Sequence, residues 1–368
     1  MNKNKIMIAF GTRPEAIKMC PLIKELKKRD EIQSVVVFTG QHREIAEDVL
    51  RTFGIIPDYS MNIMRPSQSL FDVTVNILDG IKEILCRESP SVVLVHGDTT
   101  TAFAVSLASF YMNIPVAHVE AGLRSHNMDS PFPEEFNRRA VALAASYHFA
   151  PTHFSAENLW NEGIPASQVY ITGNTVIDAL DYTLRKDFQS DHLPRNGERL
   201  IFLTAHRRES IGEPLKNMLT AVKNCVKYHK DIKVLYPVHP NGAVRQIAEY
   251  ILGDCDRITL CPPLEVTECH NILARSHIIL TDSGGIQEEA AALNKPVLIM
   301  RNVTERPEGI LAGVARLAGV DRLQIEATVN EVLTDEKIYA RMSTSPNPYG
   351  DGRACERITD ILCQNISI

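Results

Sequence analysis

The sequence predicts an α/β fold made of two Rossmann-like, doubly wound domains that face a cleft, and three observations support this. Short apolar runs rich in β-branched residues alternate with segments of helical period, which is typical of βαβ units in a mostly parallel sheet. A polar stretch over residues 186–198 interrupts the alternation, which then restarts. The length of 368 residues is also enough for two domains of common size.

The first series of strands is expected before residue 178. Its apolar runs are Ile6–Phe10, Ser34–Thr39, Ser91–Val95, Pro115–Val119, Tyr147–Ala150 and Val169–Thr172. A helix is expected over Glu15–Lys28, because its apolar residues recur on one face and two lysines stand in its last turn. We therefore place an N-terminal domain at 1–178 and a linker at 179–199.

The second series of strands follows the linker. Its apolar runs are Leu200–Thr204, Lys233–Val238, Ile258–Cys261, His277–Thr281 and Pro296–Met300. The same alternation of strand and helix predicts a second parallel sheet. We place the C-terminal domain at 200–352.

Composition excludes several classes of protein. The chain has 39 Lys and Arg against 45 Asp and Glu, a net charge of −6, so we expect no binding to nucleic acid. Its eight cysteines are irregularly spaced without a Cys-x-x-Cys motif, which argues against a zinc site or a disulfide framework. The apolar run at Ile6–Phe10 is too short for a signal peptide, and no run reaches 18 residues. A cytoplasmic protein without a membrane segment is expected.

Polar residues gather directly after the predicted strands. In open α/β sheets ligands bind beyond the carboxyl ends of the strands, so these residues are the candidates for a site. In the first half the polar segments are Gly11–Glu15, His96–Thr99 and Glu120–Arg124, and in the second half they are Thr204–Glu209, His239–Asn241 and Thr281–Gly285. All six segments could face one cleft between the domains.

The segment Ser283–Glu289 is the clearest candidate for a ligand-binding segment, because a predicted strand is followed by small residues at the start of a predicted helix. The free N–H groups and the positive dipole end of such a helix suit a phosphate group. A tight turn with Ser283 as a helix cap is the structural alternative. Neither Gly-x-Gly-x-x-Gly nor a P-loop motif is present, so the site suits a nucleotide diphosphate better than a dinucleotide or ATP. Glu288 or Glu289 could accept hydrogen bonds from ribose hydroxyls.

Three carboxylates suggest proton transfer. Asp98 and Glu120 end successive strands, and Glu134 follows fourteen residues after Glu120. Carboxylates that gather in a partly buried cleft can act as general acids and bases. His206 could be a base, a phosphate ligand or a core histidine. No cluster has the spacing of a metal site, so no metal and no cofactor is expected.

These motifs together resemble the non-hydrolysing UDP-N-acetylglucosamine 2-epimerases of bacteria, nearly from end to end. The matching segments, in order along the chain, are Gly11–Met19, Val95–Thr100, His118–Arg124, Pro131–Glu135, Thr172–Thr175, His206–Glu209, Thr281–Glu289, Thr304–Glu308 and Asn347–Gly352. The resemblance implies a fold of the glycosyltransferase-B type, with a C-terminal helix at 353–368 that crosses back to the N-terminal domain.

The resemblance also implies reversible interconversion of UDP-GlcNAc and UDP-ManNAc. Family members are understood to expel UDP by anti elimination, leaving 2-acetamidoglucal, and to add UDP back with protonation on the opposite face of C2. Two faces require more than one acid–base group, which agrees with a cluster of carboxylates. A glycosyltransferase, a hydrolysing 2-epimerase that releases free ManNAc, and a UDP-sugar sensor without catalysis remain as alternatives.

The resemblance assigns roles by position. Asp98, Glu120 and Glu134 are then the acid–base candidates, and His206 supports the departing diphosphate. The residues implied to hold UDP are Arg13, Lys18, Leu264, Cys269, Ser283, Gly284, Gly285, Glu289 and Arg306, with Glu289 on the ribose. At Leu264 and Cys269, near the uracil, relatives can carry Gln and Phe.

Two further features follow from the resemblance. Several bacterial members bind a second UDP-GlcNAc beside the active site as an activator, and the matching positions here are Gln41, His42, Gln68, Arg207 and His239. Family members also form homodimers, so a homodimer is expected. The expected partners are thus UDP-GlcNAc, UDP-ManNAc, UDP and a second copy of the chain.

Overall fold

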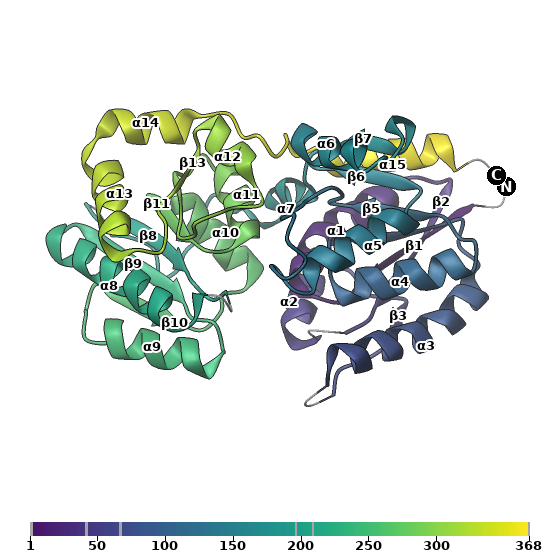
Figure 1. The fold of residues 1–368 in the computed structure, drawn as a ribbon, viewed down its shortest axis with the longest axis horizontal. Coiled ribbons are helices and arrows are strands. Elements are labelled where there is room, and N and C mark those ends of the chain that lie inside the picture. The colour runs from purple at the N-terminus through teal and green to yellow at the C-terminus, as the bar shows by residue number, and fades with distance from the viewer. Residues whose placement is uncertain (1–2, 41–42, 66–67, 196, 208–209, 367–368) are drawn as a thin grey trace. The chain divides into compact units, whose positions relative to one another are not determined.

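Two parallel β-sheets, each with its own helices, organise the chain. The computed structural model describes residues 3–40, 43–65, 68–195, 197–207 and 210–366. Its contacts divide the chain into unit 1, residues 1–182 and 350–368, and unit 2, residues 183–349. The predicted fold class, two doubly wound α/β domains, is confirmed (Figure 1).

Unit 1 contains a seven-stranded sheet in the order β3-β2-β1-β4-β5-β6-β7, and all its pairs are parallel. Its strands are β1 Asn4–Phe10, β2 Ile32–Phe38, β3 Tyr59–Ser60, β4 Val92–His96, β5 Val116–Val119, β6 Tyr147–Ala150 and β7 Val169–Ile171. Its helices are α1 Arg13–Leu26, α2 Arg43–Phe53, α3 Leu70–Glu88, α4 Thr100–Tyr111, α5 Glu134–Ala144, α6 His153–Asn161, the 3-10 helix η1 Ala166–Gln168, α7 Thr175–Thr183 and α15 Ala354–Asn365.

Unit 2 contains a six-stranded parallel sheet in the order β10-β9-β8-β11-β12-β13. Its strands are β8 Arg199–Thr204, β9 Ile232–Pro237, β10 Ile258–Cys261, β11 Ile278–Thr281, β12 Val297–Ile299 and β13 Ala315–Leu317. Its helices are α8 Glu213–Tyr228, α9 Gly242–Leu252, α10 Val266–Arg275, α11 Gly284–Ala292, α12 Pro307–Ala312, α13 Arg322–Thr334 and α14 Glu336–Thr344.

Both sheets have the strand order of the doubly wound nucleotide-binding fold, which reverses direction next to the first strand. In unit 1 the reversal lies between β1 and β4, and in unit 2 between β8 and β11. Loops after these neighbouring strands diverge to opposite faces and leave a crevice at the carboxyl edge. The topology therefore predicts one ligand-binding edge in each unit.

Each sheet is buried by its own helices. In unit 1, Met7 and Val93 of the sheet share a core with Ile77 and Ile81 of α3. In unit 2, Ile201 and Leu280 pack with Val222 of α8 in a separate core. Because strands of a parallel sheet are covered on both faces, they read as nearly continuous apolar runs, which is why the sequence revealed them.

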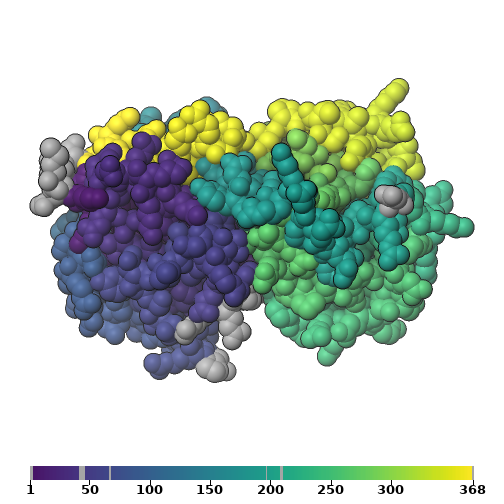
Figure 2. All heavy atoms as spheres, turned by 180° about the vertical axis from the view of Figure 1, so that it is seen from behind, coloured from purple at the N-terminus to yellow at the C-terminus, as the bar shows by residue number. Residues whose placement is uncertain are grey.

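The chain returns to unit 1 at Gly350 and ends there with α15. Asp178 of α7 accepts hydrogen bonds from the backbone N–H groups of Ala354 (3.2 Å) and Cys355 (2.9 Å), and so caps the first turn of α15. A Cβ atom on Gly350, whose φ is +132°, would lie 3.1 Å from the Cα of Gly173. Only glycine allows this approach. Figure 2 shows the yellow C-terminal segment against the purple N-terminal one.

The region expected to be a linker, 179–199, begins inside a helix, because α7 continues to Thr183. The described residues between α7 and β8 contain no helix or strand. Among the described helices of the whole chain, none is both long and apolar enough to cross a membrane.

Candidate functional site

Three neighbouring strands of unit 1 carry the predicted acid–base and binding residues at their carboxyl ends. Arg13 follows β1 and opens α1, Asp98 follows β4, and Glu120 follows β5. Because β1, β4 and β5 are adjacent in the sheet, their loops share one edge. The structure thus brings these parts of the sequence together within unit 1.

Glu120 is the most constrained of the three carboxylates. Its backbone has φ of +62°, in the left-handed region that non-glycine residues rarely adopt. Its side chain is 9% exposed, and Oε2 forms an ion pair with the Nζ of Lys18. The same oxygen accepts a hydrogen bond of 2.8 Å from Nδ2 of Asn174. The carboxylate is therefore fixed by two donors from outside its own strand.

Asp98 is held from α5. Its carboxylate pairs with the guanidinium of Arg138, and its backbone carbonyl accepts a 2.9 Å hydrogen bond from Nδ2 of Asn137. Glu134 is the first residue of the same helix and is partly buried. Helix α5 therefore presents one predicted carboxylate and fixes another.

Glu135, next to Glu134, has a structural role instead. It is fully buried and accepts hydrogen bonds from the N–H (2.9 Å) and the hydroxyl (3.1 Å) of Ser125. These bonds fasten the loop after β5 to the start of α5. Of the two glutamates in the Pro131–Glu135 motif, only Glu134 keeps some exposure.

Glu15 connects two of these loops. Its carboxylate accepts backbone N–H groups of Gly11 (3.1 Å) and Thr12 (2.8 Å), and also the hydroxyl of Thr99 (2.8 Å), which follows Asp98. Burial raises the pKa of Glu15 to about 7, although these hydrogen bonds oppose the shift. Glu15 therefore ties the start of α1 to the loop that carries Asp98.

His206 in unit 2 lies on a loop fixed by a buried carboxylate. Asp282, at the end of β11, accepts the backbone N–H groups of His206 (2.8 Å) and Arg207 (2.9 Å). The His206 ring stacks on that of His239, with 5.3 Å between centroids and 10° between planes. Both histidines follow adjacent strands, β8 and β9, so the sheet order explains why they meet.

The start of α11 combines an uncapped helix N-terminus with a nearby guanidinium. Ser283 is the N-cap residue, and its side chain makes no capping hydrogen bond, so the first N–H groups of the helix are not satisfied by their cap. The guanidinium of Arg306 lies across Gly284, where a Cβ atom would stand only 2.8 Å from Cζ. Glu288 holds the arginine through a 2.6 Å bond from Nε. The partial positive charge of the helix N-terminus and the charge of the Arg306 guanidinium therefore lie close together.

A network of arginines surrounds Glu305 near this point. Arg301 donates two hydrogen bonds to Glu305 (2.7 and 3.0 Å), and Arg207 donates one (3.4 Å). Burial alone would raise the pKa of Glu305, but the hydrogen bond from Arg301 and the charges of Arg207, Arg301 and Arg306 hold it well below its usual range. Glu305 thus stays ionised and orders the surrounding arginines.

The remaining predicted UDP contacts lie on or near α10 and α11. Glu289 is buried, and its carboxylate lies 3.5 Å from Nε2 of His270, whose Nδ1 bonds to the hydroxyl of Thr183 (2.7 Å). Leu264 precedes α10 and Cys269 lies in its first turn. These residues therefore occur in unit 2 together with the start of α11.

The predicted activator residues are distributed over both units. Gln41 and His42 lie outside the described residues. Gln68 in unit 1 bonds within its own loop, to the N–H of Arg65 (2.6 Å) and the carbonyl of Ile63 (3.0 Å). Arg207 and His239 belong to unit 2.

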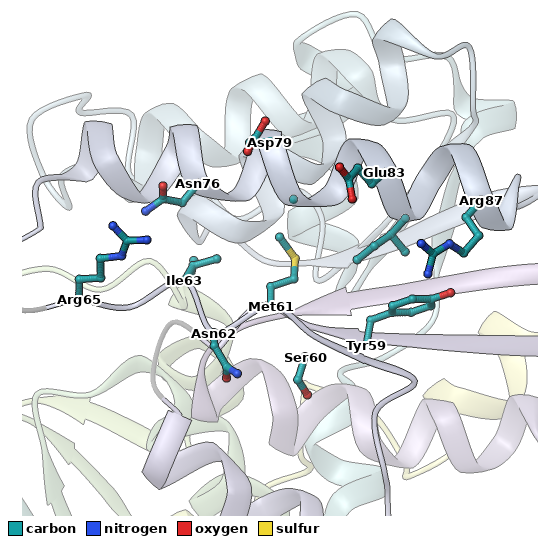
Figure 3. A pocket seen from close by; sticks show the side chains of 12 residues that line it. Tyr59, Ser60, Met61, Asn62, Ile63, Arg65, Asn76, Asp79, Glu83 and Arg87 are labelled. Atoms are coloured by element: carbon teal, nitrogen blue, oxygen red, sulfur yellow. The ribbon is translucent and has the colours of Figure 1, made fainter.

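A separate cavity of about 400 Å³ lies in unit 1 between α3 and the segment after β3. Figure 3 shows Arg65 and Arg87 at its two ends, with Met61 reaching toward the helix between them. None of the predicted site residues that the structure describes lines it. We also find no cluster of His, Cys, Asp or Glu suited to a metal ion in the described part of the chain.

Sequence reasoning gave no role to four residues that shape these sites. Asn174 and His96 lie in the matching motifs Thr172–Thr175 and Val95–Thr100, so the resemblance contained their signal. Asp282 likewise lies in the Thr281–Glu289 motif. Arg138, the partner of Asp98, lies outside every motif. Its only sequence signal is its place one helical turn after Glu134.

The fold and these side chains define a class: an α/β protein with two Rossmann-like units, one carrying fixed carboxylates and the other a helix N-terminus beside a fixed guanidinium. Comparison with known proteins narrows this class. The model of the UDP-N-acetylglucosamine 2-epimerase family matches residues 24–363. This chain belongs to that family.

Individual relatives match almost the whole chain. The UDP-N-acetylglucosamine 2-epimerase of Bacillus subtilis is 51% identical over 363 residues, which cover 98% of this chain and 96% of the relative. The crystal structure of the Neisseria meningitidis UDP-GlcNAc 2-epimerase bound to UDP-GlcNAc has a TM-score of 0.95 at 44% identity, and the match covers 98% of this chain and 100% of that one. The S. aureus MnaA-UDP co-structure has a TM-score of 0.93 at 47% identity and coverage of 98% and 96%.

Proposed function

We propose that this chain interconverts UDP-GlcNAc and UDP-ManNAc by elimination and re-addition of UDP. The observation that carries the proposal is the edge of unit 1, where the Glu120 carboxylate is fixed by Lys18 and Asn174, and Asp98 by Arg138. Fixed, partly buried carboxylates are suited to proton transfer at carbon. Relatives whose names and structures specify UDP-GlcNAc support the choice of substrate.

The reaction divides into two half-steps. One carboxylate removes the proton at C2, the bond between C1 and the diphosphate oxygen breaks, and UDP leaves with the bonding electrons as 2-acetamidoglucal forms. UDP then attacks C1 again while an acid protonates C2 on the opposite face. Asp98, Glu120 and Glu134 supply the acid and base groups. Three carboxylates from three segments allow protons to be handled on both faces.

Unit 2 holds the UDP. Ser283, Gly284 and Gly285 offer backbone N–H groups to the diphosphate, and Arg306 adds a guanidinium already fixed by Glu288. Positive charge stabilises UDP more strongly after it has left, because the departing oxygen then carries a full negative charge. His206 adds to this stabilisation. Glu289 binds the ribose, while Leu264 and Cys269 line the uracil.

Arg13 and Lys18 of unit 1 extend the positive surroundings of the diphosphate. Arg13 is at the N-terminus of α1, where the helix dipole also favours an anion. Lys18 stands one turn further along and pairs with Glu120. Its ammonium is therefore fixed beside the acid–base carboxylate.

A second UDP-GlcNAc, bound as an activator, is part of the same proposal. Gln41, His42, Gln68, Arg207 and His239 are its contacts. The stacking of His239 on His206 supports this placement, because a ligand on His239 would bear directly on a residue of the diphosphate site. Activation would then act through the orientation of the His206 ring.

The protein is also proposed to form a homodimer through unit 1. Helices α3, α4 and α5 pack side by side (Figure 1), and their outer faces expose large apolar side chains. These include Phe71, Val75, Phe110, Tyr111, Phe136 and Leu143. Large apolar side chains exposed on three neighbouring helices are suited to burial against a second copy of the same face.

Proton NMR of the protein with UDP-GlcNAc in D₂O tests the proposed reaction. We expect UDP-ManNAc with deuterium at C2, and each of Asp98→Asn, Glu120→Gln and Glu134→Gln should lower turnover about 100-fold or more while UDP still binds. Wild-type turnover in one variant would remove that carboxylate from the mechanism. Free ManNAc as the main product would indicate a hydrolase, and binding without any reaction would indicate a transferase or a sensor.

A further inference from the structure

His96 ends β4 directly beside Glu120. The residue is 4% exposed, and its Nε2 lies 3.8 Å from Oε2 of Glu120, the oxygen that also contacts Lys18 and Asn174. Nε2 is buried and has no hydrogen-bond partner in the described part of the chain. A buried polar atom without a partner costs about 1–3 kcal/mol, so its presence requires an explanation.

Lys18 and Asn174, two of these neighbours of Oε2, can only donate hydrogen bonds. The Lys18 ammonium has no acceptor atom. The Asn174 amide is oriented by its own oxygen, which accepts the N–H of Val176 (3.0 Å) at the start of α7, so its NH₂ group faces Glu120. Both neighbours therefore stabilise the carboxylate and oppose its protonated form.

The protonated carboxyl needs the opposite kind of neighbour. Once Glu120 has taken a proton, its O–H group becomes a donor and gains from an acceptor. Among these three neighbours, only the neutral imidazole of His96 can accept, through Nε2. An approach of about 1 Å would bring the two atoms to normal hydrogen-bond distance.

We propose that His96 is a positioning residue for Glu120, whose neutral Nε2 accepts a hydrogen bond from the carboxyl group while Glu120 carries the proton exchanged with C2. This inference rests on the proposed function, because it needs Glu120 to alternate between its two protonation states. Lys18 and Asn174 then stabilise one state and His96 the other.

The surroundings keep His96 able to accept. Burial lowers its pKa to about 4; the charges of Glu120 and Asp98 oppose this shift, and that of Lys18 supports it. His118, on the neighbouring strand, is neutral for the same reason, since burial lowers its pKa to about 3, and its Nε2 bonds to the carbonyl of Gly97 (2.8 Å). At neutral pH the imidazole of His96 thus carries no charge and offers a lone pair.

The test compares the pH profile of kcat in three variants with the wild type. His96→Leu removes the acceptor and should lower kcat about 10-fold, the effect of one lost hydrogen bond. Glu120→Gln identifies the limb of the profile that is due to Glu120, because this limb is absent in that variant. In His96→Leu the same limb should move to lower pH, because the protonated carboxyl of Glu120 loses its hydrogen-bond acceptor. His96→Gln keeps an acceptor oxygen near the position of Nε2 and should restore both rate and limb. UDP affinity should stay unchanged in both His96 variants.

Asn174→Ser is a control that should shift the limb in the direction opposite to His96→Leu. Serine still caps α7 but cannot reach Glu120 with an amide, so the same limb should move to higher pH. His148→Leu is the matched control for burial. His148 is fully buried on β6 of the same sheet. This variant should keep the wild-type limb.

Three results would overturn the inference: an unmoved limb in His96→Leu, a shift in the same direction as Asn174→Ser, or an equal shift in His148→Leu. If His96→Leu does not fold, His96→Gln decides, since a wild-type rate and limb support the inference and a 10-fold loss overturns it. A wild-type protein without epimerase activity would instead overturn the proposed function. Normal wild-type activity with an unmoved limb would refute only the role of His96.

Discussion

Replacing Glu15 by Gln should change how the stability of unit 1 depends on pH. Glu15 is buried in the first turn of α1, and its carboxylate accepts three hydrogen bonds, two from backbone N–H groups and one from Thr99. Gln can accept the same backbone N–H groups and donate to the Thr99 hydroxyl. The variant therefore keeps the local contacts and removes only the titration of the side chain.

The magnitude follows from the pKa shift. Burial raises the pKa of Glu15 from 4.5 to about 7, so between these values the folded state binds more protons than the unfolded state. The contribution of Glu15 to stability is then fully present below about pH 4.5 and is lost as pH rises through about 7. A shift of this size corresponds to about 3 kcal/mol in total, and to about 2–3 kcal/mol between pH 5 and pH 8.

Urea unfolding followed by tryptophan fluorescence measures this difference. The chain contains one tryptophan, Trp160 on α6, so the signal reports on unit 1, where Glu15 lies. We expect the wild type to lose about 2–3 kcal/mol relative to Glu15→Gln between pH 5 and pH 8. Parallel stability curves for the two proteins would refute the reasoning, because they would show that Glu15 has a similar pKa in the folded and unfolded states.

Three further changes test other parts of the structure. Asp178→Ala should lower the free energy of unfolding of unit 1 by about 2 kcal/mol, because α15 loses its cap. Asp178→Asn should lower it less, and equal decreases in the two variants, measured by Trp160 fluorescence, would contradict capping. Gly284→Ala should weaken UDP binding about 10-fold in calorimetry, because the new methyl displaces the Arg306 guanidinium; unchanged affinity would remove Arg306 from the site. Phe71→Glu should convert a dimer into monomers in sedimentation while the circular dichroism spectrum of the folded chain is retained; a persisting dimer would place the interface elsewhere.

The fold was largely predictable because its strands are buried on both faces. Every strand predicted from an apolar run is present, and its ends differ by at most two residues from the expected ones. The strands β3, Tyr59–Ser60, and β13, Ala315–Leu317, were not predicted. They are two and three residues long and lie at sheet edges, where pairing with one neighbour decides the structure and no apolar period can form.

The partners of the site residues were not predictable in the same way. The rule that ligands lie beyond strand ends, together with the resemblance, selected Asp98 and Glu120. It could not reveal that Lys18, expected to hold UDP, also pairs with Glu120, because the two residues lie 102 positions apart. Arg138 was missed as the partner of Asp98 for the same reason. Such pairs depend on how α1 and α5 pack on the sheet, which a single sequence does not contain.

Several costs of folding are concentrated around Glu120. Its left-handed backbone costs about 1 kcal/mol in a residue other than glycine. Its charge is buried and requires the Lys18 ammonium to be buried as well. The adjacent His96 leaves a ring nitrogen without a partner.

Packing does not require these features. A glycine at position 120 would adopt the left-handed backbone without strain, and an apolar residue at position 96 would pack in the sheet without a buried polar atom. Unfavourable local features of this kind persist where the surrounding structure enforces them for a function. Under the proposed function each of the three features has a use, because Glu120 then gains and loses a proton. The backbone turns the carboxylate of Glu120 toward Lys18 and Asn174. The Lys18 ammonium stabilises the charged form of this carboxylate, and His96 accepts a hydrogen bond from its protonated form.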